Sequence, residues 1–144
     1  MKDLNIFKTQ HIHKVIKMEN SQWIEKNMHI TLLGFSKFHG LKPFKLESLI
    51  KLIKEPENKY DNEAIACEMR YFGKVGYVAN STQTVAMGTM SSGRVYDKID
   101  DTYFAKVKFI TQNTVIAKIL TSEEYNEEMK NPQSDIHYLS DSDD

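Results

Sequence analysis

One stretch of the sequence combines residue types that suit nucleic-acid chemistry. Residues 54–65 form a polar, proline-containing segment in which Tyr60 and Asp61 stand just before an apolar run. A tyrosine ring can stack on a base, and a carboxylate can accept a hydrogen bond from a sugar hydroxyl. Because phosphates repel a carboxylate, such a pair suits a place where a phosphate is missing. The residues therefore indicate a pocket for a free hydroxyl end of a strand.

The same segment also has a purely structural interpretation. Asn58 and Asp61 are residue types that favour turns, and Tyr60 would then cover one end of the fold. The sequence alone leaves both interpretations open.

The rest of the chain offers no set of residues typical of catalysis. His11 and His13 would share one side of a strand, but their segment has helical spacing, which separates the two rings. The chain has no glycine-rich phosphate loop and no Gly-x-Ser-x-Gly turn. Cys67 is predicted to be a buried structural thiol. Because it is the single cysteine of the sequence, the chain has no internal disulfide framework and no cysteine-built zinc site. We expect no enzymatic activity, no metal and no cofactor.

Composition is typical of a folded protein with one domain. The 144 residues are 40% hydrophobic and 27% charged, which suits a compact domain with extensions. No segment has the apolar length of a membrane span, and the first residues lack the apolar core of a signal peptide. These properties predict a cytoplasmic protein without a membrane partner.

Charge is distributed unevenly along the chain. Residues 1–120 contain 18 lysines and arginines against 12 acids, whereas residues 121–144 contain eight acids and one lysine. A basic body attracts polyanions, and an acidic tail either competes with them or keeps the protein soluble. Lysines also commonly form a solvated surface, so charge alone does not decide between a polyanion partner and a plain surface.

Apolar spacing changes along the chain from a helical period to a strand period. Residues 1–27 are expected to form an N-terminal helical extension, and from residue 28 onward the period is two. Phe72 and Gly73 would link the third and fourth strands in a tight turn with glycine at a positive φ. The expected strands cover residues 29–33, 47–54, 63–71, 74–78, 103–110 and 113–120.

Three finer expectations concern the second half of the chain. Val107 and Phe109 are expected to face the same side of the fifth strand. Residues 82–87 are expected to form a short helix between Ser81 and Gly88, and the following segment, residues 89–100, is either a loop or another short helix. The acidic region 121–144 is expected to begin with a short helix, since Thr121 and Glu124 resemble a capping box, and to end in a disordered tail.

Six short strands with helical insertions predict a mainly β fold. The most consistent architecture is a small six-stranded OB-like β-barrel over residues 28–120. SH3-like and other small barrels give the same pattern, and barrels of the OB type commonly bind single-stranded nucleic acid.

Spaced motifs in this region resemble the HIRAN domain family, in particular its short, stand-alone bacterial members. The resemblance covers roughly residues 28–120 and implies an OB-like barrel that binds DNA. In helicase-fused members of the family such a domain captures a single-stranded 3′ end. The motifs are Gly34-Phe35-x-x-Phe38-x-Gly40, Lys54-Glu55-Pro56-x-Asn58-x-Tyr60-Asp61-x-x-Ala64-Ile65 and Gly73-x-Val75-Gly76-Tyr77-Val78.

The resemblance also implies roles for individual residues. Asp61 would hold the terminal 3′-hydroxyl, Tyr60 would stack at the terminal nucleotide, and Asn58 would support the loop. Tyr77 and Tyr103 would add aromatic contacts from the following strands. Further contacts are expected at the exit of the first strand, from Lys37 and Phe38, and as phosphate contacts from Lys54, Arg94 and Lys98, joined by Lys106 and Lys108 if the barrel brings these five together.

These observations favour a nucleic-acid-binding module for single-stranded DNA or a DNA 3′ end, in repair, processing or defence. RNA is not excluded as the partner, and a co-encoded nuclease or helicase would supply chemistry, since the hydrolase activity of multi-domain relatives belongs to other domains. The alternative is a non-catalytic protein-interaction adaptor that docks through the N-terminal helix or the acidic tail. The acidic tail is also a candidate for self-inhibition of nucleic-acid binding.

Overall fold

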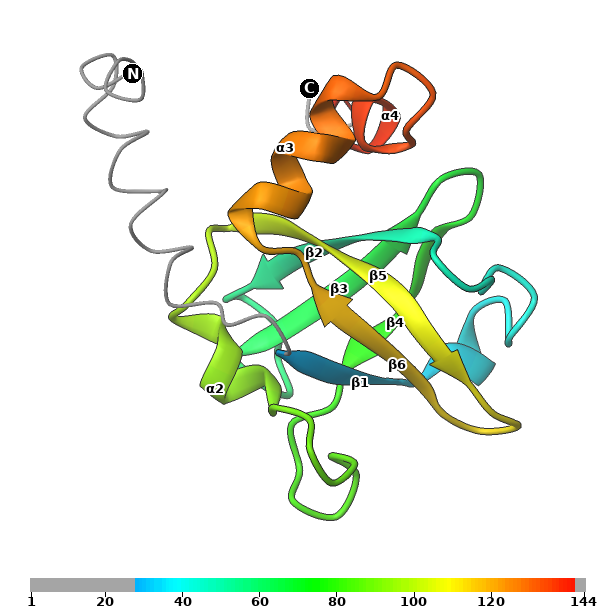
Figure 1. Ribbon diagram of the computed structural model, residues 1–144. Coiled ribbons are helices and arrows are strands. Elements are labelled where there is room, and N and C mark those ends of the chain that lie inside the picture. The colour runs from blue at the N-terminus through cyan, green and yellow to red at the C-terminus, as the bar shows by residue number, and fades with distance from the viewer. Residues whose placement is uncertain (1–27, 142–144) are drawn as a thin grey trace.

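The computed structural model describes residues 28–141, which form a closed barrel of six antiparallel strands (Figure 1). The hydrogen-bonded order is β1-β4-β3-β2-β5-β6, and β6 pairs with β1 to close the barrel. The predicted mainly β, six-stranded OB-like barrel is confirmed, and the helix predicted over residues 1–27 lies outside the described residues. The strands are β1 (His29–Leu33), β2 (Leu49–Glu55), β3 (Ala64–Met69), β4 (Gly73–Val78), β5 (Thr102–Ile110) and β6 (Val115–Ile119).

Alternating apolar side chains fill the barrel. Cys67 is fully buried among them, as predicted, and burial raises the pKa of its thiol, which makes it an unreactive core residue. Gly76 is needed where β4 approaches β1, since a Cβ there would lie 2.7 Å from the carbonyl oxygen of Leu33. Fully buried members of the core include Ile30, Leu32, Ile50, Leu52, Ile65, Val75 and Val107.

The link between β3 and β4 is a tight turn with two residues at positive φ. Gly73 has φ 70°, as the sequence predicted for this glycine. Tyr71 also has a positive φ, of 76°, which is uncommon for a residue with a side chain. The ring of Tyr71 points outward and is largely exposed.

One side chain of β5 faces the opposite way from the prediction. The pairing of β5 with β6 shifts register between Val107 and Phe109, which indicates a β-bulge. A bulge adds a residue to one strand and reverses the alternation beyond it. Val107 therefore points into the core, whereas Phe109 is 59% exposed, and the expectation that both share one face is wrong.

The segment before the first α-helix is a series of turns. The expected helix over residues 82–87 is absent, and Ser81 instead accepts hydrogen bonds from the backbone of Gln83, Thr84 and Val85 within a turn. The chain becomes helical only at α2 (Ser92–Tyr96), where the Ser91 hydroxyl accepts a hydrogen bond from the Arg94 amide. A one-turn helix η1 (Phe35–Lys37) follows β1.

The acidic end of the chain is folded up to residue 141. Thr121 and Glu124 form the predicted capping box at the start of α3 (Ser122–Lys130). The expected disorder beyond it is wrong for residues 131–141, because a second helix, α4 (Ile136–Asp141), buries Ile136 and Leu139 against the barrel. Isolated apolar residues in an acidic segment gave a weak signal, yet here they complete a second apolar cluster.

None of the helices in the described part of the chain has the length and apolar character needed to cross a membrane. Within residues 28–141, no three histidine, cysteine, aspartate or glutamate side chains are grouped as a metal-ligand set.

Candidate nucleic-acid interface

The loop between β2 and β3 is built from consecutive turns. A first turn closes with a hydrogen bond from the Asn58 amide to the Glu55 carbonyl, and Pro56 occupies the position of this turn that proline favours. The side-chain oxygen of Asn58 then accepts hydrogen bonds from the amides of Tyr60 (2.9 Å) and Asp61 (3.1 Å). These bonds leave the Tyr60 side chain 86% exposed, so this ring does not cover an end of the barrel.

Asp61 is held by one bond on each of its carboxylate oxygens. Oδ1 accepts from the amide of Glu63 at 2.9 Å, and Oδ2 accepts from the side-chain amide of Asn80 at 2.8 Å. Asn80 in turn accepts from the amide of Gly93 at 2.8 Å, which links the loop to α2. The turn interpretation of Asn58 and Asp61 is confirmed, and Asp61 also joins the loop to Asn80. A carboxylate has about four lone-pair sites, so Asp61 keeps capacity for a further donor.

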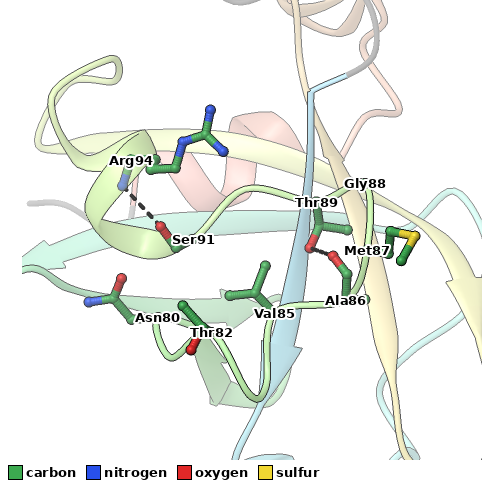
Figure 2. Close-up of a pocket in the computed structure, with 9 residues that line it drawn as sticks. All are labelled: Asn80, Thr82, Val85, Ala86, Met87, Gly88, Thr89, Ser91 and Arg94. Carbon is green, nitrogen blue, oxygen red and sulfur yellow. Dashed lines mark hydrogen bonds between the residues drawn. The ribbon is translucent and has the colours of Figure 1, made fainter.

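A hollow of about 320 Å³ lies beside this network. Asn80 connects the two, because it lines the hollow and binds Asp61. Figure 2 shows Arg94 and Met87 on opposite sides of the hollow, and the Arg94 side chain forms no ion pair with any other residue of the described range. The lining residues are Asn80, Thr82, Val85, Ala86, Met87, Gly88, Thr89, Ser91 and Arg94.

The expected basic residues fall into two groups. Lys54 lies with its ammonium 4.6 Å from the centre of the Tyr96 ring of α2, and Arg94 and Lys98 lie on α2 and just after it. Lys106 and Lys108 instead lie toward the far end of β5, where both pair with Glu47. Thr102 pairs with Ile53 at the near end of that strand, so the two groups are separated by roughly 15–20 Å of extended chain. The barrel does not bring the five to one face.

Tyr77 faces the outside of the barrel but its hydroxyl is engaged. It donates to the carboxylate of Glu55 (2.9 Å) and accepts from the ammonium of Lys74 (2.9 Å). The Phe38 ring lies 6.4 Å from the Tyr77 ring and is 39% exposed, and Lys37 is exposed at the end of η1. Phe38 and Lys37 are therefore accessible, whereas Tyr77 is committed to a network within the protein.

Tyr103 is a core residue. Its ring is 9% exposed, and its hydroxyl donates to the carbonyl of Leu120 at 2.8 Å. It stacks against Tyr125 of α3 at 6.3 Å, and burial, aided by nearby acidic groups, raises the pKa of the hydroxyl. The aromatic contact with nucleic acid expected of Tyr103 is therefore not available in this fold, because alternation along β5 turns the ring inward.

The acidic helices cover a different part of the barrel, which we call the tail-covered face. There Leu49, Phe104 and Leu120 pack against Ile136 and Leu139 of α4. Three ion pairs surround this seam: Lys118 with Glu124 (2.6 Å), Lys106 with Glu128 (2.6 Å), and Arg70 with Asp135 (2.9 Å). In Figure 1, α3 and α4 lie above the barrel and the loop that precedes α2 lies below it. The described part of the tail thus pairs with two lysines and an arginine away from the Tyr60–Asp61 loop.

Sequence reasoning missed the contribution of residues 80–91. Asn80 belongs to the site because it binds Asp61 and lines the hollow, and neither contact follows from its position two residues after a strand. The available signal was the polar run from Asn80 to Thr84, most of which was assigned to the predicted helix and its cap. A run of short polar residues after a strand equally favours turns, because their side chains bind the backbone locally.

Comparison with known proteins gives structural neighbours and no sequence relatives. The chain matches no protein-family model and no curated protein. Among solved structures it is similar to a protein from Lactobacillus plantarum, with a TM-score of 0.47 and 18% identity over 63% of this chain and 87% of that one. It is also similar to the HIRAN domain of human HLTF, with a TM-score of 0.48 and 17% identity over 63% of this chain and 70% of that one.

Proposed function

We propose that this chain is a non-enzymatic module that binds single-stranded DNA at its 3′ end through the Tyr60–Asp61 loop, serving DNA repair, processing or defence. The observation that carries the proposal is the exposed Tyr60 ring beside an oriented Asp61 carboxylate, next to a hollow lined by Arg94, which forms no ion pair within residues 28–141. The motifs that resemble HIRAN domains point to the same loop. A nuclease or helicase encoded nearby would supply any chemistry.

Each part of this site has a role in the proposal. Tyr60 stacks on a base, which is worth roughly 1–3 kcal/mol per base. Asp61 accepts a hydrogen bond from the terminal 3′-hydroxyl, and it disfavours a 3′-phosphate by charge repulsion. The hollow has a volume near the lower limit of small-ligand pockets, which run from about 300 to 1,000 Å³, and Arg94 offers a cation to a phosphate.

The modest positive charge of the site limits the salt dependence. Lys54, Arg94 and Lys98 are cations in or beside α2 that form no ion pair with another described residue. A single strand releases about 0.7 counterion per neutralised phosphate, so three contacts predict a log–log salt slope of about −2. Stacking and the Asp61 hydrogen bond add affinity that salt screens less.

The test is fluorescence anisotropy with a labelled single-stranded oligonucleotide that ends in either a 3′-hydroxyl or a 3′-phosphate. We expect the hydroxyl end to bind more tightly, and Asp61→Ala to weaken that binding about tenfold and remove the preference. Asp97→Ala is the matched control, because Asp97 is an exposed carboxylate at the end of α2. An RNA oligonucleotide of the same sequence tests the choice between DNA and RNA.

Two outcomes would overturn the proposal. If Asp61→Ala weakens both ends equally, Asp61 acts only as a turn residue and 3′-end capture fails. If neither oligonucleotide binds even at low salt, the function moves to a protein-interaction adaptor, which deletion of residues 1–27 would then test.

A further inference from the structure

Three side chains on the outside of β2 and β4 form a closed network. The ammonium of Lys74 donates to Glu55 Oε2 at 2.8 Å and to the Tyr77 hydroxyl at 2.9 Å. The Tyr77 hydroxyl donates to Glu55 Oε1 at 2.9 Å, which completes the triangle. All three residues are half-buried. A network of this kind restrains the rotamers of its members more than isolated surface bonds do.

The network fixes the charge of Glu55. Partial burial by itself would raise the pKa of this carboxyl, but hydrogen bonds from Lys74, Asn58 and Tyr77 lower it below its ordinary value. The pKa of Lys74 is raised, first by its bond to Glu55 and then by its bond to Tyr77. Both groups are therefore charged at neutral pH, and charge-assisted hydrogen bonds are stronger than neutral ones.

Asn58 connects this network to the candidate site. Its side-chain NH₂ donates to Glu55 Oε1 at 3.0 Å, while its oxygen accepts from the amides of Tyr60 and Asp61. The amide group of asparagine is planar and has a donor at one end and an acceptor at the other. Because Glu55 holds the donor end, the acceptor end must point at the two loop amides.

We infer that Lys74 and Tyr77 are positioning residues of the Tyr60–Asp61 loop, acting through Glu55 and Asn58. The sequence resemblance implied a direct ligand contact for Tyr77, whereas its hydroxyl is here the link between β4 and the loop. Lys74 carries a positive charge, but its ammonium forms an ion pair with Glu55. The effect on DNA binding rests on the proposed function, whereas the effect on the loop itself does not.

The first experiment needs no ligand. Amide hydrogen exchange of Tyr60 and Asp61 is followed by NMR in the parent, in Tyr77→Phe and in Lys74→Met. Each variant is expected to speed exchange at both amides about fivefold, because the Asn58 side chain loses its fixed orientation. Tyr71→Phe is the matched control, since the Tyr71 ring is exposed on the neighbouring turn and its hydroxyl forms no hydrogen bond with another described residue. Unchanged exchange in both variants would overturn the inference.

A swap of polarity tests the link through Asn58. Asn58→Asp keeps an acceptor for the two loop amides but places a second carboxylate against Glu55, so exchange is expected to rise. Adding Glu55→Gln restores a donor toward residue 58 but removes the acceptor of the Tyr77 hydroxyl, so exchange is expected to slow only part of the way back toward the parent. Failure of the second substitution to restore protection would contradict the proposed path.

The ligand experiment separates positioning from contact. Tyr77→Phe keeps the ring, so direct stacking predicts unchanged binding, whereas positioning predicts about threefold to fivefold weaker binding of the 3′-hydroxyl oligonucleotide. Lys74→Met is expected to weaken binding with an unchanged salt slope. A slope reduced by about 0.7 would instead make Lys74 a phosphate contact. If the parent fails to bind DNA, the proposed function fails while the exchange experiment still decides the positioning role.

Discussion

The Tyr60–Asp61 loop and the tail-covered face carry charged groups on the same barrel, and they use them differently. On the tail-covered face, Arg70, Lys106 and Lys118 each pair with an acid of the chain's own C-terminal region, residues 121–141. Around the loop, Arg94 has no such partner in the part of the chain that the structure describes, and the Tyr60 ring is exposed. A lysine or arginine in a basic body is thus available to a polyanion only where the same chain has not already neutralised it.

The apolar content of the two regions differs in the same direction. Ile136 is fully buried and Leu139 nearly so, whereas the largest side chain of the loop points into solvent. Apolar burial stabilises the fold, and an exposed aromatic ring contributes little to it. The comparison assigns stability to the tail-covered face, the proposed function assigns ligand contact to the loop, and three predictions test this division.

The largest expected effect is on the free energy of unfolding. Ile136→Ala removes buried methyl and methylene groups from the second apolar cluster and should lower the unfolding free energy by about 3 kcal/mol. Tyr60→Ala should change it by less than about 0.5 kcal/mol, because the ring is exposed. Urea denaturation followed by circular dichroism measures both.

The same pair of variants should behave in the opposite way toward DNA. At a temperature where both are folded, Tyr60→Ala should weaken binding of the 3′-hydroxyl oligonucleotide. The expected loss is at least about fivefold, because stacking of one base contributes about 1–3 kcal/mol. Ile136→Ala should leave binding unchanged. A large loss of stability in Tyr60→Ala would break the division between the two regions.

The second prediction concerns two cations on either side of this division. Arg94→Met should weaken DNA binding a few-fold and reduce the salt slope by about 0.7, because one phosphate contact is lost. Lys106→Met should leave the slope unchanged, because Glu128 and Glu47 already hold its ammonium. Anisotropy titrations from low to moderate salt measure both slopes. Equal loss of slope in the two variants would extend the DNA path along β5.

The sequence was sufficient for the barrel and for part of the candidate site. Period-two spacing gave the six strands, and the pattern around Tyr60 and Asp61 gave the loop, because these signals are local. Prediction from the sequence failed where a partner far away along the chain determines the local structure. The bulge that exposes Phe109 depends on pairing with β6, and the fold of residues 131–141 depends on an apolar seam between Phe104 and Ile136.

The sequence did not predict the roles of Asn80 and Tyr77, and the reason is the same. Asn80 binds Asp61 across 19 positions, and Tyr77 binds Glu55 across 22. Neither residue type indicates such a hydrogen-bond partner, because asparagine is common after a strand and tyrosine is common within one. Residue type therefore predicted which side chains are capable of the chemistry, whereas the tertiary hydrogen bonds decide which of them are accessible to a ligand.

The smallest expected effect is the pH dependence of the tail-covered face. Partial burial alone would raise the pKa values of Glu124 and Glu128, but hydrogen bonds and ion pairs lower both. For Glu124 these contacts come from Lys118 and the backbone of Thr121, and for Glu128 they come from Lys106 and Ser134. Folded-state pKa values below the unfolded ones mean that the unfolded chain binds more protons. The stabilisation is therefore complete above about pH 4.5 and is lost as pH falls through the folded values.

Solvent screening keeps this contribution below about 1 kcal/mol for each pair. The double variant Glu124→Gln, Glu128→Gln should therefore flatten the fall in urea-unfolding free energy between pH 5 and about pH 3 without abolishing it, since Glu55 also has a lowered pKa. Its DNA binding at pH 7 should equal that of the parent, because the two acids pair with lysines away from the Tyr60–Asp61 loop. Tighter binding would instead reveal that the released Lys106 and Lys118 reach the DNA, so that the tail competes with the ligand and the two regions act as one surface.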